Sequence, residues 1–91
     1  MKTIEIIFRF WKNEVIALFP YIIENNRGDV MCYQHIGQHG SADYGYIIES
    51  SKPATKEQYQ PLLNELVNDV GYLNLKIVKK RNYKRFAKLI E

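Results

Sequence analysis

The chain has 91 residues, enough for one hydrophobic core and too few for two, so residues 1–91 are expected to form a single domain. Hydrophobic residues make up 46% and charged residues 25%, a balance that excludes an intrinsically disordered chain. The net charge of +3 hides an asymmetry, because residues 1–75 carry six Lys/Arg against nine Asp/Glu and residues 76–91 carry seven against one.

The single cysteine, Cys32, cannot form a disulfide within the chain, and this favours a reducing compartment. The first nine residues do not resemble a signal peptide, because Glu5 and Arg9 interrupt their apolar run. No apolar run approaches the roughly 20 residues of a membrane span. We therefore expect a cytoplasmic protein with no membrane partner.

The first half of the chain predicts strands. Residues 3–11 consist of strand-favouring residue types, with alternate positions forming two apolar-rich faces. A turn at 12–13 leads to a second strand over 14–19, which Pro20 is expected to close. After a polar loop, residues 30–35 predict a third strand. This half therefore predicts a three-stranded antiparallel meander.

The next segment is less regular. Gly37 and Gly40 are expected to end the third strand, and Ser41 is then placed to cap a short helix or turn over 42–50. Three of its apolar side chains are expected to be buried: Tyr44, Ile47 and Ile48.

Residues 56–70 give the clearest helical pattern. Thr55 is placed as the N-cap, with Gln58 completing a capping box. Pro61 is expected to kink the first turn or to move the helix start toward Gln58, and Gly71 is expected to end the helix. The apolar stripe of this helix consists of Tyr59, Leu62, Leu63, Leu66, Val67 and Val70.

The last third of the chain predicts a fourth strand over 72–79, at an edge or beside the first strand. Its buried face is expected to consist of Leu73, Leu75 and Ile77. A short basic amphipathic helix follows, with Tyr83, Phe86, Ala87 and Ile90 opposite Lys84, Arg85 and Lys88. The predicted fold is α+β: a three- to four-stranded mainly antiparallel sheet, one helix packed on one face and a short C-terminal basic helix.

The block from Cys32 to Tyr44 contains the only cysteine and both histidines, so a metal site and a Cys–His nucleophile must be considered. Cys32 and His35 lie an odd number of positions apart, so on a strand they point to opposite faces. No second cysteine completes a zinc pattern. We therefore expect no metal, no cofactor and no catalytic residue here.

A weaker possibility in the same block is that residues 37–41 form a backbone concavity that binds a phosphate or a carboxylate at a helix start. The alternative is that the two glycines only allow a turn with positive φ. The candidate loop site consists of His35, Gln38, His39, Asp43 and Tyr44.

Three segments also resemble a family of short bacterial and phage-encoded proteins. They are Val15 to Pro20, then Cys32 to Tyr44 with its His-x-Gly-Gln-His-Gly-x-Ala-Asp-Tyr block, and Lys52 to Thr55 followed by Tyr59. The resemblance spans roughly residues 4–80 and covers most of the chain. It implies an intracellular protein associated with mobile or phage-like genes, and it implies no activity, substrate or cofactor. The resemblance also implies that other members of that family have an ordinary residue at the position of Pro61.

Two functions remain open from the sequence. The first is a small binding module for nucleic acid, in which a basic cluster contacts phosphates and a tyrosine stacks on a base. The residues of that cluster are Lys79, Lys80, Arg81, Tyr83, Lys84, Arg85 and Lys88. The alternative is a protein-interaction or regulatory module that binds a partner through the Cys32–Tyr44 surface or an exposed sheet edge, while the basic tail only keeps the chain soluble. An enzyme that uses the cysteine and the histidines ranks third.

Overall fold

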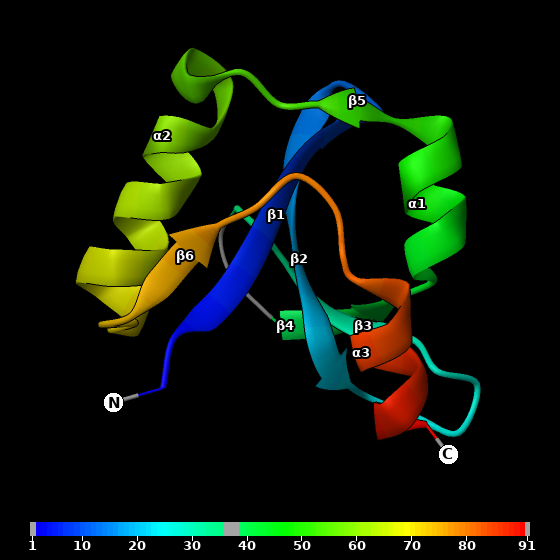
Figure 1. Cartoon of the computed structure of the whole chain (residues 1–91). Coiled ribbons are helices and arrows are strands. Elements are labelled where there is room, and N and C mark those ends of the chain that lie inside the picture. The colour runs from blue at the N-terminus through cyan, green and yellow to red at the C-terminus, as the bar shows by residue number, and fades with distance from the viewer. Residues whose placement is uncertain (1, 36–38, 91) are drawn as a thin grey trace.

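The computed structural model describes residues 2–35 and 39–90. Within them, six strands form one sheet in the order β4-β3-β2-β1-β5, and β6 also pairs with β1 (Figure 1). The elements are β1 (Ile4–Trp11), β2 (Glu14–Ile23), β3 (Val30–Gln34), β4 (His39–Ala42), α1 (Tyr44–Ser50), β5 (Lys52–Pro53), α2 (Lys56–Glu65), the π-helical turn η1 (Leu66–Val70), β6 (Leu75–Ile77) and α3 (Tyr83–Leu89).

The α+β class is confirmed, and so is the antiparallel meander of β1, β2 and β3. The sheet is larger than predicted, because β4 extends the meander and the two-residue strand β5 pairs with β1. It is also mixed, since β6 runs parallel to β1. The turn between β1 and β2 is confirmed at Lys12 and Asn13, whose φ angles of 50° and 63° are the positive values that a two-residue hairpin turn of type I′ requires.

The prediction that Pro20 ends the second strand is wrong, since β2 continues to Ile23. The register of β2 against β3 shifts between Phe19 and Ile23. Proline has no N–H to donate to a neighbouring strand, so it is tolerated at an irregularity of this kind, where the regular pairing is interrupted. The shift also inverts the alternation of side chains. Phe19 packs on one face of the sheet and Tyr21, two residues later, packs on the other.

The predicted helix cap at Ser41 is wrong. Gly40 and Ser41 belong to β4, which forms a hairpin with β3, and α1 begins at Tyr44. Its N-cap is Asp43, whose carboxylate accepts a hydrogen bond from the Tyr46 backbone N–H at 3.1 Å. Ser41 and Asp43 both have short polar side chains of the kind that cap helices, and the strand pairing of β4 decides which one caps.

The long helix is confirmed together with its capping box, in which Thr55 and Gln58 satisfy each other's backbone N–H groups. Pro61 lies inside the helix. The helix begins at Lys56, so the proline does not move its start toward Gln58. The helix then widens into η1, and Gly71 ends it with a φ of 101°, a left-handed conformation that favours glycine.

Helices cover both faces of the sheet, whereas the sequence predicted one helix on one face. The α2 face is covered by α2 and η1, and the α1/α3 face by α1 and α3 (Figure 1). The buried side chains of the α2 face are Ile6, Phe8, Ala17, Phe19, Tyr33, Leu62 and Leu66. Those of the α1/α3 face are Ile7, Ile16, Leu18, Val30, Ala42, Ile47 and Phe86.

The fourth predicted strand is present as β6, beside β1 as expected, but it has only three residues. Its predicted buried face is wrong, because Leu73 is 81% exposed and Ile77 42% exposed. Only Leu75 of that set packs against the α2 face, while Val78 packs on the opposite face. The chain therefore leaves an apolar surface beside β6.

Candidate functional site

The basic C-terminal segment is attached to the α1/α3 face by its backbone as well as its side chains. The backbone N–H of Arg81 donates to the hydroxyl of Tyr44 at 2.9 Å, and that of Asn82 donates to the hydroxyl of Tyr21 at 2.7 Å. Asn82 caps α3, and Phe86 is 5% exposed. The segment is therefore part of the fold.

Arg81 is held between two rings. Its guanidinium carbon lies 3.9 Å from the centroid of Tyr44 and 3.4 Å from that of Phe86. Burial lowers the pKa of Arg81, and among the described residues its buried Nη1 has no hydrogen-bond partner. Such cation–π contacts are worth about 0.5–2 kcal/mol. Arg81 thus packs α3 against α1.

Arg85 is also engaged within the fold. Its guanidinium carbon lies 3.9 Å from the centroid of Tyr21, and its Nη1 forms an ion pair with Glu5 of β1. A charge neutralised in this way contributes less to attraction of a phosphate than a free one does. Two of the seven residues in the predicted basic cluster therefore serve the fold.

The other five residues of that cluster are exposed. Tyr83 is 75% exposed, and across residues 2–35 and 39–90 the structure has no ion pair that includes its lysine neighbours. These five residues form what we call the lysine surface: Lys79, Lys80, Tyr83, Lys84 and Lys88.

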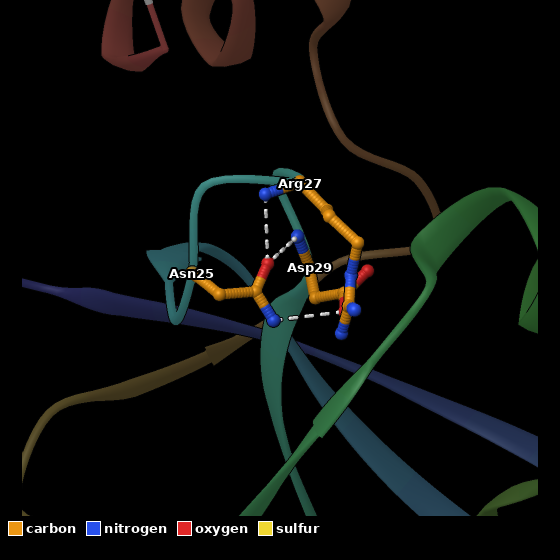
Figure 2. A network of polar contacts seen from close by, with 3 residues as sticks. All are labelled: Asn25, Arg27 and Asp29. Carbon is orange, nitrogen blue, oxygen red and sulfur yellow. Dashed lines mark hydrogen bonds and ion pairs between the residues drawn. The ribbon is translucent and has the colours of Figure 1, made fainter.

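A cavity of about 440 Å³ lies on the same side of the molecule, next to Arg81. One wall is the loop after β2, where Asn25 accepts hydrogen bonds from the backbone N–H groups of Arg27 and Asp29 (Figure 2). Hydrogen bonds from Asn25 and then from Arg27 lower the pKa of Asp29. Since Asp29 and Asp43 line the cavity together with Arg27 and Arg81, it presents both signs of charge.

The candidate loop site is divided between the two faces of the sheet. His35 and His39 both lie on the α2 face, where His39 packs 5.0 Å from the Tyr33 ring and accepts or donates a hydrogen bond at the Tyr72 hydroxyl. Asp43 and Tyr44 lie on the opposite side, as the cap and the first residue of α1. Gln38, like Gly37, lies outside the described residues.

The histidines have partners that the sequence did not indicate. His35 Nδ1 lies 2.6 Å from Glu65 Oε1, and the Tyr33 hydroxyl donates to the other oxygen of the same carboxylate. Glu65 precedes Leu66 of the apolar stripe of α2, and a glutamate at such a position is ordinarily exposed to solvent, so the sequence gives no sign of its contact with β3. A pocket of about 280 Å³ beside His35 is lined by apolar and polar side chains in equal number.

Cys32 points away from both histidines. It packs on the α1/α3 face, and burial raises the pKa of its thiol, which opposes formation of a nucleophilic thiolate. In the part of the chain that the structure describes, no three His, Cys, Asp or Glu side chains gather as metal ligands would. The opposite-face prediction for Cys32 and His35 is confirmed.

No family model, no curated protein and no solved structure matches this chain. The resemblance to short bacterial and phage-encoded proteins therefore stays a prediction. None of the helices in the described residues has the length and apolar character needed to cross a membrane.

Proposed function

We propose that this chain is a small nucleic-acid-binding module that contacts phosphates through the lysine surface and stacks Tyr83 on an unpaired base. The observation that carries the proposal is the 75% exposure of Tyr83 beside lysines that form no ion pair within residues 2–35 and 39–90. Large aromatic side chains usually bury their rings. Stacking of a base on an aromatic side chain is worth about 1–3 kcal/mol.

The attachment of the segment supports this proposal. Because Arg81 and Arg85 hold α3 against the sheet, the lysine surface is positioned before any ligand arrives. Lys84 and Lys88 are four residues apart on α3 and therefore lie on one side of it. A preformed surface loses less conformational entropy on binding than a disordered tail.

The charge distribution limits the size of the contact. Residues 1–75 are net negative, so attraction of phosphates is confined to the C-terminal segment. Contacts to about four phosphates predict that log K falls with log salt with a slope of about −3 on single strands. A short single-stranded site fits both the exposed ring and this limited charge.

The test is fluorescence anisotropy with a short single-stranded oligonucleotide across a series of salt concentrations. We expect Lys84→Gln to make the slope shallower by about 0.7, whatever the base sequence. Tyr83→Ala is expected to weaken binding by about 1–3 kcal/mol without changing the slope. Lys56→Gln, an exposed lysine on α2, is the matched control and should change neither quantity.

Absence of binding at low salt would refute the proposal and leave the lysines as a solubilising surface. Equal losses in Lys84→Gln and Lys56→Gln would refute it too, because attraction would then depend on total charge alone. The predicted setting is the bacterial cytoplasm, which the resemblance and the single cysteine support. Expression of the chain in its source cell with a fluorescent tag tests that setting separately.

A further inference from the structure

The surface beside β6 has a second set of features that nucleic-acid binding does not use. A groove of about 370 Å³ separates η1 from β6, and its apolar lining includes Leu63, Val67, Leu73 and Ile77. Leu73 is 81% exposed, while Val67 and Ile77 are each 42% exposed. Contiguous exposed apolar side chains of this kind mark interaction sites.

The outer edge of β6 is also open. In the described residues β6 pairs with β1 alone, and Asn74 C=O and Val78 N–H both bond to β1, at 2.7 and 2.9 Å. Backbone groups alternate in direction along a strand, so those of Leu75 and Ile77 point away from β1. This edge can accept an added strand.

The two faces of β6 differ in chemistry. Leu75 and Ile77 are in register with Ile4 and Ile6 and lie on the groove side. Lys76 is in register with Glu5 and lies on the other side, but Glu5 is already paired with Arg85. Lys76 is exposed and forms none of the ion pairs found in the described residues.

We propose that the open edge of β6 binds an extended segment of another protein in which apolar and acidic residues alternate. The apolar side chains of that segment fill the groove, and its carboxylates lie beside Lys76. A second copy of this chain fits poorly, because antiparallel pairing of two β6 edges about Lys76 brings the Lys76 side chains of both copies together. Like charges on adjacent strands are destabilising.

The probe is a short acetylated peptide of alternating valine and glutamate, titrated into the isotope-labelled full chain and followed by NMR. We expect shifts at residues 63–79, and slower hydrogen exchange of the amides of Leu75 and Ile77. A peptide of the same composition with valines and glutamates in separate blocks is the first control. A peptide N-methylated at alternate residues is the second, because it keeps its side chains and loses strand hydrogen bonds. Both should bind at least about tenfold more weakly.

Charge reversal sharpens the test. Lys76→Glu should weaken binding of the valine–glutamate peptide by about tenfold and should improve binding of a valine–lysine peptide. Lys52→Glu on β5 is the matched control, and thermal unfolding verifies that both variants fold.

Equal binding of the alternating and N-methylated peptides would overturn the proposal, as would shifts confined to the lysine surface. Concentration-dependent shifts at residues 73–79 without peptide would also overturn it, since the occupant would then be a second copy.

Discussion

The two faces of the sheet are closed by different means. On the α2 face, 15 consecutive helical residues of α2 and η1 pack apolar side chains such as Leu62 and Leu66 onto the sheet. The α1/α3 face is covered by two helices of seven residues each. Isolated helices of that length are unstable in water.

Contacts of arginine side chains help to hold the two short helices α1 and α3 against the sheet. Arg9 of β1, which is 8% exposed, donates to the carbonyls of Ile48 and Ser51 at the end of α1 and to the Ser51 hydroxyl. The last carbonyls of a helix have no partner within it, so Arg9 acts as the C-terminal cap. Arg81 and Arg85 hold α3. Both faces therefore bury apolar side chains, and the α1/α3 face has in addition long-range contacts of arginine side chains.

The largest expected effect is on the α2 face. Leu66 is fully buried at the junction of α2 and η1, so Leu66→Ala should lower the free energy of unfolding by about 2–5 kcal/mol. Urea unfolding monitored by Trp11 fluorescence measures it. The neighbouring Val67→Ala, at a 42% exposed position, should cost about 0.5 kcal/mol or less. Similar losses in both variants would mean that burial on this face is not the main source of stability.

Arg9→Met tests the other face. The substitution keeps an unbranched apolar stem and removes the guanidinium with its hydrogen bonds to the end of α1, so we expect a loss of about 2–3 kcal/mol. Hydrogen exchange should rise in α1 well before it rises in α2. Arg27→Met, at an exposed arginine, is the matched control. Uniform exchange in all helices would argue against a capping role for Arg9.

The parts of the fold that the sequence predicts well depend on neighbours in the chain. The capping box of Thr55 and Gln58, the stop at Gly71 and the turn at Lys12–Asn13 each require information from only a few residues. The helix start at Tyr44 was misplaced because Ser41 and Asp43 are both good caps, and only the pairing of β4 with β3 decides between them.

Contacts between residues far apart in the sequence explain the remaining differences between the predictions and the structure, both in the fold and in the candidate site. Arg9 meets Ser51 across 42 positions, and no local pattern identifies a buried arginine as a helix cap. Likewise, seven residues looked equivalent in the basic cluster, and only the positions of Tyr21, Tyr44 and Glu5 separate the two arginines from the lysine surface. The pairing of His35 with Glu65 spans 30 positions and was missed for the same reason.

A smaller effect is expected from Tyr33→Phe. The substitution keeps the buried ring and removes the hydroxyl that donates to Glu65, so the loss should be about 1 kcal/mol. Chemical denaturation of the variant checks this value. A loss as large as that of Leu66→Ala would show that polar contacts, and not apolar burial alone, hold the α2 face.

The two faces can also be compared by the effect of alkaline pH on stability, because each face has a partly buried group that ionises at high pH. Burial raises the pKa of Cys32 on the α1/α3 face from its ordinary value of 9.0, and burial also raises the pKa of Tyr72 on the α2 face. In both cases the unfolded chain ionises first, so their contribution to stability is complete below the unfolded pKa and is lost as pH rises through the folded one. Each group can change the slope of stability against pH by at most about 1.4 kcal/mol per pH unit.

Unfolding in urea at a series of pH values from neutral to alkaline separates these contributions. Cys32→Ala should make the decline shallower from about pH 9 upward, whereas Tyr72→Phe should do so only at higher pH, because a phenol ionises later than a thiol. An unchanged alkaline decline in Cys32→Ala would mean that the thiol ionises without opening its face. The apolar packing of the α1/α3 face around Cys32 would then be loose enough to hydrate a thiolate.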